Sequence, residues 1–573
     1  MPLSIAESPA EGLAKKRILE TEGNGETNLQ GNPVPFEENR VAENPVEENR
    51  ARDRNAPPDL SRVPAGPRVG FVSLGCPKNL VDSEVMMGLL DRAGAQLTSQ
   101  PETAEILVVN TCSFIDRAKQ ESVDAILEMA RYKLNGTAKK LIVAGCLVER
   151  YRDEIRENIP EVDAVVGTGE LDQILAAAGL QSPPAGSPQE PQLFNILPAR
   201  SQTQAVASRP EGNLRESQGR FARYEWSGAR PALPQYLYDH ATPRLLSTGR
   251  SSAYIKIAEG CDHPCSFCVI PNLRGKFRSR QFDSVILEAE QLVAQGVREI
   301  TLVGQDTTCY GEDLGLKEGL ARLLERLAAI PDLKWLRFLY AYPNKITGRL
   351  LETIARHANI CNYLDVPLQH ASGPVLKAMR RGGNAEIFLK TIEKIRAAIP
   401  GVALRTSFIA GFPGETESDF ATLMDFVKEA RFDWLGVFSY SDEEGSGAFH
   451  LGAKVPRKTI EARRRALMRV QQSISKRSNA GLIGRRFDVL VEGESEETPL
   501  LWEGRTERQA PEIDGKLYIN DFGPFDRLTP GSFYRCEIGE SHDYDLVARI
   551  VEEEPTEMSA AGADVAEGVR RLL

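Results

Sequence analysis

The 573-residue sequence has no apolar run approaching the roughly 20 residues that a membrane-spanning helix needs. Its N-terminal stretch has no apolar core followed by a cleavage site, so we expect a cytoplasmic protein rather than a secreted one. No segment carries the broad positive charge of a protein that grips a phosphate backbone, which argues against DNA binding. Neither a Ser/His/Asp set nor an HExxH zinc motif stands out, so hydrolase chemistry of these kinds is not indicated.

Negative charge is concentrated at two places in a chain of net charge −11. Residues 1–67 hold 12 acidic and 8 basic side chains, and residues 480–551 hold 15 acidic and 8 basic ones. The first segment is rich in Glu, Asn, Pro and Gly without a hydrophobic period, which predicts a disordered acidic extension. A flexible tail is expected at 553–573. The acidic C-terminal region favours a basic partner over a nucleic acid.

Residues 68–180 alternate short β-branched runs with segments of helical periodicity. This alternation predicts a small Rossmann-like parallel α/β domain. The expected strands are 69–74, 106–110, 141–144 and 164–166, and the expected helices are 79–92, 116–132, 148–158 and 171–178. Residues 181–246 are rich in Pro, Ser, Gln and Gly and indicate a linker or insertion. Some of its aromatic residues are expected to dock on a folded surface: Phe221, Tyr224, Trp226, Tyr236 and Tyr238.

Residues 247–477 repeat the β/α alternation on a larger scale. Six such units fit a partial (β/α)6 barrel of the TIM type, whose sites lie at the C-terminal ends of the strands. The expected strands are 253–257, 299–303, 336–340, 363–366, 404–409 and 434–438. A basic amphipathic stretch at 458–476 is interpreted as a solvated helix that leaves the barrel.

Residues 478–552 change to short alternating runs separated by Gly, Pro and Glu-rich turns. This pattern predicts a small antiparallel, all-β barrel. The expected strands are 487–491, 500–505, 517–520, 533–538 and 545–551.

Three of the nine cysteines form the motif EGCDHPCSFC, directly after the first expected barrel strand. Cys261, Cys265 and Cys268 are spaced to bind three irons of a cubane cluster. No fourth cysteine is near, so one iron stays open to a small molecule. A zinc site or three incidental buried cysteines are the alternatives. Zinc usually takes four ligands in paired spacings, and His263 is badly placed between the first two cysteines.

A second set of three cysteines is widely separated in sequence. Cys76, Cys112 and Cys146 each directly follow one of the first three strands, in FVSLGC, LVVNTC and LIVAGC. Parallel strands end on one side of a sheet, so three thiols should meet there, near helix N-termini that favour thiolate. The alternative is that they are small buried apolar residues. Three further cysteines have no partner at ligand spacing and are interpreted as structural: Cys309, Cys361 and Cys536.

The Cys-x-x-x-Cys-x-x-Cys motif at this position resembles the radical S-adenosylmethionine (SAM) superfamily. Over residues 68–551 the order of domains resembles the methylthiotransferases of that class, whose C-terminal domain is an OB-like TRAM barrel. Four segments resemble the branch that modifies a ribosomal protein: SLGCPKNLVDSE (73–84), YIKIAEGCDHPCSFCVIP (254–271), RTSFIAGFPGET (405–416) and RQAPEIDG (508–515). The long N-terminal extension and the 181–246 insertion depart from the usual pattern of the family.

The resemblance implies two [4Fe–4S] clusters, an auxiliary one on the first cysteine set and the radical one on the second. The substrate implied is the β-carbon of an aspartate of small-subunit ribosomal protein S12. One SAM would supply the methyl group and another the 5′-deoxyadenosyl radical, while the auxiliary open iron would carry the sulfur. An electron donor such as flavodoxin or ferredoxin and a sulfur donor would be partners, and we expect a monomer.

Six residues at or near barrel strand ends are candidates for contact with SAM, although each could be ordinary barrel packing. They are Gln305, Asp306, Arg405, Ser407, Val437 and Phe438. His370 lies at another strand end, where it either faces the cavity or, as we favour, is a satisfied structural histidine.

Two other functions fit the same motifs. One is methylthiolation of a modified adenosine next to the tRNA anticodon, and the other is a non-catalytic iron–sulfur scaffold.

Overall fold

Three folded parts follow one another along the residues that the computed structural model describes: 66–181, 236–249, 251–495, 498 and 500–553. The expected acidic extension, the C-terminal tail and most of the expected linker, with Phe221, Tyr224 and Trp226, lie outside the described residues. Among the described residues, every helix is either too short or too polar to cross a membrane.

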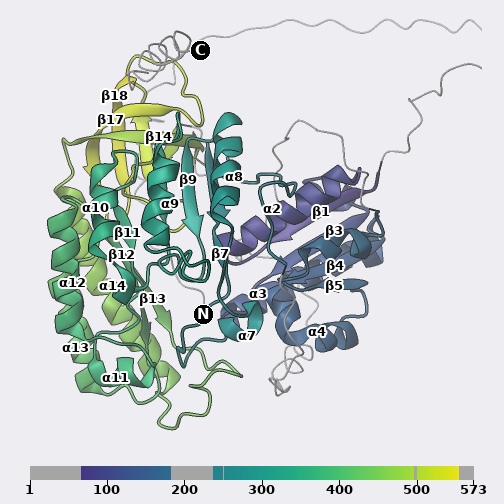
Figure 1. Cartoon of the computed structure of the whole chain (residues 1–573), viewed down its shortest axis with the longest axis horizontal. Coiled ribbons are helices and arrows are strands. Elements are labelled where there is room, and N and C mark those ends of the chain that lie inside the picture. The colour runs from purple at the N-terminus through teal and green to yellow at the C-terminus, as the bar shows by residue number, and fades with distance from the viewer. Residues whose placement is uncertain (1–65, 182–235, 250, 496–497, 499, 554–573) are drawn as a thin grey trace, which may run out of the picture. The chain divides into compact units, whose positions relative to one another are not determined.

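The first part is a parallel sheet in the order β2-β1-β3-β4-β5 with helices against it (Figure 1). The strands are β1 (Arg68–Ser73), β2 (Gln96–Leu97), β3 (Ile106–Thr111), β4 (Lys140–Gly145) and β5 (Ala164–Val166). The helices are α2 (Pro77–Arg92), α3 (Asp116–Asn135), α4 (Cys146–Asn158) and α5 (Ile174–Ala178). Every residue of β3 is buried, as expected of a central strand in a parallel sheet. The four expected strands are confirmed, and the short edge strand β2 was not expected.

The second part contains six parallel strands, which confirms the expected partial barrel. The strands are β6 (Ser252–Lys256), β9 (Glu299–Val303), β10 (Trp335–Phe338), β11 (Tyr363–Asp365), β12 (Ala403–Ala410) and β13 (Trp434–Ser439). They form two three-stranded sheets, β10-β9-β6 and β11-β12-β13. Backbone hydrogen bonds link the two sheets, for example from Ala341 N to the Asp365 carbonyl oxygen at 2.9 Å.

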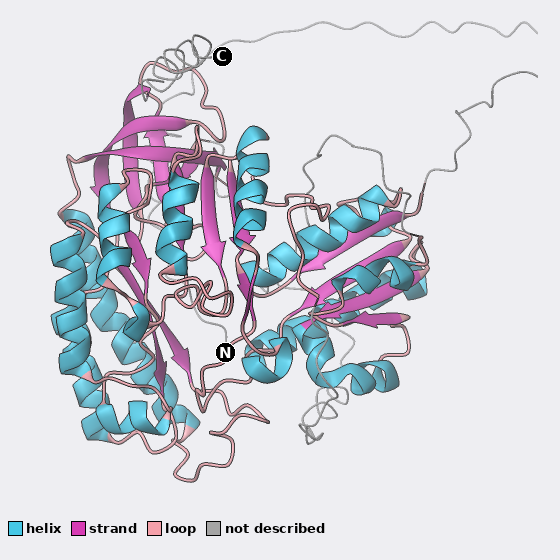
Figure 2. Cartoon of the chain, viewed as in Figure 1, coloured by secondary structure: helices cyan, strands magenta, loops and turns pink. Residues whose placement is uncertain are grey.

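Helices cover the outer face of these strands (Figure 2). They are α8 (Phe282–Ala294), α9 (Gly319–Ala328), α10 (Gly348–Arg356), α12 (Ala385–Ala398), α13 (Glu417–Ala430) and α14 (Arg457–Ala480). Two short helices, α7 (Ile270–Arg274) and α11 (Gly373–Ala378), lie in the loops that follow β6 and β11. The α13 start has a capping box, in which Thr416 and Asp419 satisfy each other's backbone N–H groups. The strand–helix core includes Ile255, Leu302 and Phe408, each fully buried.

The third part is a closed five-stranded barrel in the order β14-β15-β16-β18-β17. Its strands are β14 (Arg486–Glu494), β15 (Trp502–Arg505), β16 (Leu517–Asp521), β17 (Phe533–Ser541) and β18 (Leu546–Glu553). The expected small all-β barrel is confirmed, but its pairing is not antiparallel throughout, because β16 and β18 pair in parallel. Strand direction cannot alternate all the way round a closed ring of five, so one parallel pair is required.

The small barrel is fixed to the N-terminal ends of the large barrel's strands by buried charges. Glu299, at the start of β9, is fully buried and accepts hydrogen bonds from Arg337 and from Arg505 of the small barrel. Asp514 of the same barrel accepts a hydrogen bond from Tyr363 at 2.7 Å. This end of the large barrel is therefore closed, and the opposite end carries the candidate site.

The segment 236–249 joins the first part to the second. Tyr238 is buried, as the sequence predicted for some linker aromatics, and its hydroxyl bonds Glu288 of α8. Arg244 pairs with both Glu84 of α2 and Glu288, each at 2.6 Å. The two cysteine-bearing parts are therefore connected by a buried ionic contact.

Candidate active site

The structure brings Cys76, Cys112 and Cys146 together at the C-terminal ends of β1, β3 and β4. Cys76 is the N-cap of α2, and Cys146 is the first residue of α4. Gly75 has a φ of 95°, and a Cβ there would lie 2.8 Å from the Cys112 Cβ, so only glycine lets the two cysteine turns approach this closely. Burial, together with the neighbouring Cys146 and Cys76, raises the pKa of Cys112 to about 12.

Positive charge faces this cysteine set. Burial alone would raise the pKa of the Cys76 thiol, but Lys78 and Arg274 lower it below its usual value. The Lys78 ammonium lies 3.5 Å above the ring of Tyr340, at the end of β10. These charges favour the thiolate at Cys76, whereas burial raises the pKa of Cys112 and of Cys146.

The second cysteine set lies in the loop 260–277, between two short antiparallel strands, β7 (Ala258–Glu259) and β8 (Arg278–Ser279). Burial, together with the neighbouring Cys265 and Cys261, raises the pKa of Cys268 to about 12. Such thiols ionise only with positive charge beside them, as a bound metal ion would supply. The Arg381 guanidinium lies 3.6 Å from the Cys265 Sγ and 4.5 Å from the centre of the Tyr342 ring.

His263, between Cys261 and Cys265, is held in place rather than free. Its Nε2 lies 2.5 Å from a carboxylate oxygen of Asp306, and its ring stacks on Tyr342 at 3.9 Å. Cys309 donates to the same oxygen of Asp306 at 3.1 Å. Cys309, interpreted from sequence as structural, therefore belongs to the network that supports the loop.

The two cysteine sets are linked through α7, which follows Cys268 and packs against Cys146. Cys146 packs against Val269 and Leu273, and Val269 directly follows Cys268. Arg274 donates to the Cys146 Sγ at 3.4 Å.

Arg274 belongs to a buried charge cluster at this junction. The members come from both parts: Asp82, Lys256, Glu259 and Arg274. Burial would raise the pKa of Glu259, but Arg274 and Lys256 hold it well below its usual range. The four charges balance, which a buried cluster needs in order to be tolerated.

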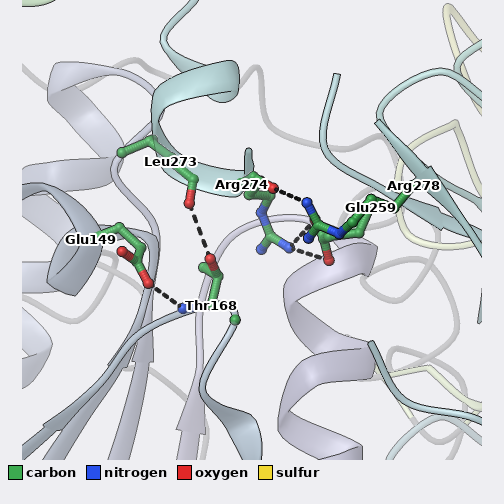
Figure 3. A pocket seen from close by; sticks show the side chains of 7 residues that line it. Glu149, Thr168, Glu259, Leu273, Arg274 and Arg278 are labelled. Atoms are coloured by element: carbon green, nitrogen blue, oxygen red, sulfur yellow. Dashed lines mark hydrogen bonds and ion pairs between the residues drawn. The ribbon is translucent and has the colours of Figure 1, made fainter. Parts of the chain in front are cut away.

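A narrow crevice opens beside Arg274 (Figure 3). Thr168 closes one side, with its backbone N–H on Glu149 at 2.8 Å and its hydroxyl on the Leu273 carbonyl oxygen at 3.1 Å. Arg278 donates to the Arg274 carbonyl oxygen on the other side. The crevice is too narrow for a water molecule, so it is a seam between the two parts and not a ligand pocket.

The structure places the six candidate SAM residues in different environments. Gln305 follows β9, and its Nε2 donates to Glu259 at 2.9 Å. The Oε1 of Gln305 is buried and has no hydrogen-bond partner among the described residues. Asp306 is 2% exposed, and its carboxylate is occupied by His263, Thr308 and Cys309. Of Gln305 and Asp306, only Gln305 therefore has an acceptor atom without a hydrogen-bond partner among the described residues.

Ser407 and Phe438 lie near each other, because both are close to the Cβ position of Gly436. Val437 belongs instead to the core beneath the helices, since successive residues of a strand point to opposite faces. Arg405 lies near the N-terminal end of β12 and pairs with Asp365 and Asp514, so the structure does not bring it to the cysteine end. His370 is fully buried, with its Nδ1 accepting from the Ser372 N–H.

Sequence reasoning missed Arg274, Arg381 and the charge cluster. Arg274 is six residues after Cys268, and that proximity was the one available signal. Arg381 contacts Cys265, and Lys256 contacts Asp82 of the first part as well as its near neighbour Glu259, so no local sequence pattern indicates these contacts in full.

A cysteine-bearing parallel sheet, a six-stranded partial barrel with a three-cysteine loop, and a small β-barrel define a three-domain radical SAM protein. Family models agree: "Uncharacterized protein family UPF0004" matches residues 68–167, "Radical SAM superfamily" matches 255–427 and "TRAM domain" matches 483–551.

Two relatives match this chain over almost the whole of their own length. The "Ribosomal protein uS12 methylthiotransferase RimO" of Koribacter versatilis is 66% identical over 84% of this chain and 96% of its own. The protein of that name from Solibacter usitatus is 56% identical over 86% and 96%. A solved methyltransferase, TsrM from Kitasatospora setae, has 16% identity and a TM-score of 0.43 over 65% and 72%, a likeness too low to bear on function. The chain belongs to the RimO family of radical SAM methylthiotransferases.

Proposed function

We propose that this chain transfers a methylthio group to the β-carbon of an aspartate of ribosomal protein uS12. One SAM would donate the methyl group, and another would provide the 5′-deoxyadenosyl radical. The observation that carries this proposal is the meeting of two cysteine sets across α7, where Cys146 contacts Val269 next to Cys268. The names of the relatives support the substrate.

The two sets of cysteine thiols fit the two proposed iron–sulfur clusters. Each set offers three free thiols, and three thiolates per cubane leave one iron open. We propose that Cys76, Cys112 and Cys146 hold the auxiliary [4Fe–4S] cluster, and that Cys261, Cys265 and Cys268 hold the radical one. When bound, the radical cluster would supply the electron that cleaves SAM to the 5′-deoxyadenosyl radical, and the auxiliary cluster would carry the sulfur that replaces hydrogen on the substrate carbon.

The residues around the cysteines would bind SAM, orient the cysteine loop and balance the charge of the thiolates. The free Oε1 of Gln305 suits the amino group of SAM, a donor that needs an acceptor in this buried place. Asp306 fixes His263 and thereby the loop between Cys261 and Cys265. Lys78 and Arg274 balance the negative charge of the auxiliary thiolates.

We further propose the division into an auxiliary-cluster domain (68–180), a radical SAM domain (247–477) and a TRAM domain (478–552). The excess of acidic residues in the last suits a basic ribosomal protein better than tRNA. Flavodoxin or ferredoxin as reductant, a separate sulfur donor and action as a monomer complete the proposal.

The test is an anaerobic reaction of the reconstituted enzyme with SAM, reductant and sulfide, offered either uS12 or tRNA. We expect uS12 to gain one methylthio group in place of a hydrogen, and 5′-deoxyadenosine to appear. A gain on tRNA alone would establish the tRNA function instead. Absence of 5′-deoxyadenosine would favour the scaffold.

A further inference from the structure

A loop of the radical SAM domain, residues 440–454 after β13, contacts the loop of the second cysteine set. The Ala448 N–H donates to the carbonyl oxygen of Ser266 at 2.6 Å, and Ser266 lies between Cys265 and Cys268. The Asn272 side chain donates to the Gly445 carbonyl oxygen at 3.3 Å. The 440–454 loop contributes only backbone atoms to these two hydrogen bonds, so its shape sets the contact, and the one side chain involved is Asn272 of the partner loop.

The same loop reaches the other cysteine set through an ion pair. Glu443 is 3% exposed and accepts from Arg150 of α4 at 2.6 Å. Arg150 also donates to the carbonyl oxygen of Ser113 at 3.3 Å, and Ser113 directly follows Cys112. The Ser113 hydroxyl in turn donates to the Cys146 carbonyl oxygen at 3.1 Å. Arg150 thus holds the two turns that carry Cys112 and Cys146.

The loop between these ends is internally braced. Lys454 donates to Asp442 and to the carbonyl oxygens of Ala448 and Phe449. The Ser441 hydroxyl donates to the second oxygen of Glu443. A displacement at Glu443 would therefore be passed on to Ala448 and Ser266.

We propose that the Arg150–Glu443 pair is a positioning device that sets the spacing between the two cysteine sets, and hence between the site of the radical and the site of the sulfur. The inference rests on the proposed function. Neither residue touches a thiol in the contacts above, so both act through the turns they hold.

The physical reason lies in what a buried ion pair can and cannot do. Taking two charges out of water costs about as much as their attraction returns, so the pair adds little stability by itself. It does fix geometry, because misfit leaves a buried charge uncompensated. Radical transfer needs that geometry, since a misplacement of about 1 Å can cost on the order of 100-fold in rate.

The test compares Glu443→Gln, the double variant Arg150→Met/Glu443→Leu and Arg150→Lys with the wild-type chain, all reconstituted with iron and sulfide. The double variant removes both charges of the pair, and Lys119, which also bonds Glu443 at 3.1 Å, keeps Asp116 as its partner, so a folded form stays available. Arg152→Ala is the matched control, because Arg152 lies on the same helix but pairs with Glu170 within its own domain.

Two quantities are measured: methylthiolated uS12 formed per 5′-deoxyadenosine, and the magnetic interaction between the two reduced clusters by pulsed electron paramagnetic resonance. We expect full iron content and continued 5′-deoxyadenosine formation in all variants. The product ratio should fall on the order of 10- to 100-fold in Glu443→Gln and the double variant, less in Arg150→Lys, and not in Arg152→Ala. The magnetic interaction should change in the same variants.

An unchanged product ratio in Glu443→Gln would overturn the proposal, and so would an equal fall in Arg152→Ala. Loss of iron from either site would also overturn it. The pair would then be needed to form one of the cluster sites, and not to set the spacing between the two cysteine sets. If the wild-type chain modifies no uS12, the proposed function fails, while the magnetic interaction still decides whether the pair sets the spacing.

Discussion

Arg274 donates a hydrogen bond to the Sγ of Cys146 at 3.4 Å, although the two residues are 128 positions apart and belong to different domains. The same guanidinium pairs with Glu259 at 2.9 Å and with Asp82 at 3.2 Å. One side chain therefore contacts the Cys146 thiol and two buried carboxylates.

Replacing Arg274 by Met should weaken the auxiliary cluster selectively. Groups that orient and balance metal ligands typically contribute roughly 10- to 100-fold to metal affinity. We expect faster loss of about half the iron during anaerobic dialysis, followed by absorbance, with the radical cluster retained. Arg278→Ala is the control, since Arg278 lines the same seam without contacting a thiol, and an identical loss there would refute the role of Arg274.

Single cysteine variants test the ligand assignment. Cys112→Ala and Cys265→Ala should each reduce iron from about eight to about four atoms per chain, because each removes one cubane. Cys536→Ala, in the core of the small barrel, should keep all the iron. Analysis of iron and acid-labile sulfide per chain tests this assignment. A wild-type content of about four irons would exclude the second cluster.

Glu299→Gln tests the attachment of the small barrel. It would leave Arg337 buried without a counter-charge, which typically costs about 3–5 kcal/mol, while Arg505 would keep only Glu492 as its partner. The thermal midpoint should fall by several degrees. Glu537→Gln, which removes the partner of the exposed Arg486 and Arg549, should leave the midpoint unchanged. Equal effects in the two variants would contradict this account of the interface.

Asp514 should make stability depend on pH. Burial raises the pKa of this carboxyl from 3.8 to about 6, against the opposing effect of Arg405. The folded form thus binds the proton more tightly than the unfolded form, and this contribution is complete below pH 3.8 and is lost as the pH rises through about 6. Asp514→Asn should flatten the slope of the unfolding free energy across that window. An unaltered slope would show that Asp514 is ionised throughout.

The sequence was sufficient for what local patterns encode. Six barrel strands followed from β-branched runs between helical periods, and the thiols of Cys76, Cys112 and Cys146 were grouped because parallel strands end on one side. Contacts between residues that are far apart in the sequence could not be predicted from local patterns. The parallel pairing of β16 with β18 comes from ring closure, and the position of Arg405 at the closed end of the barrel depends on Asp514, more than 100 residues later.

Mass spectrometry of uS12, purified from small ribosomal subunits of a strain lacking this gene, tests the central claim most directly. The account predicts a uS12 lighter by one methylthio group relative to hydrogen, restored by the wild-type gene and not by a Cys146→Ala copy. A uS12 of unchanged mass in the deletion strain would contradict it.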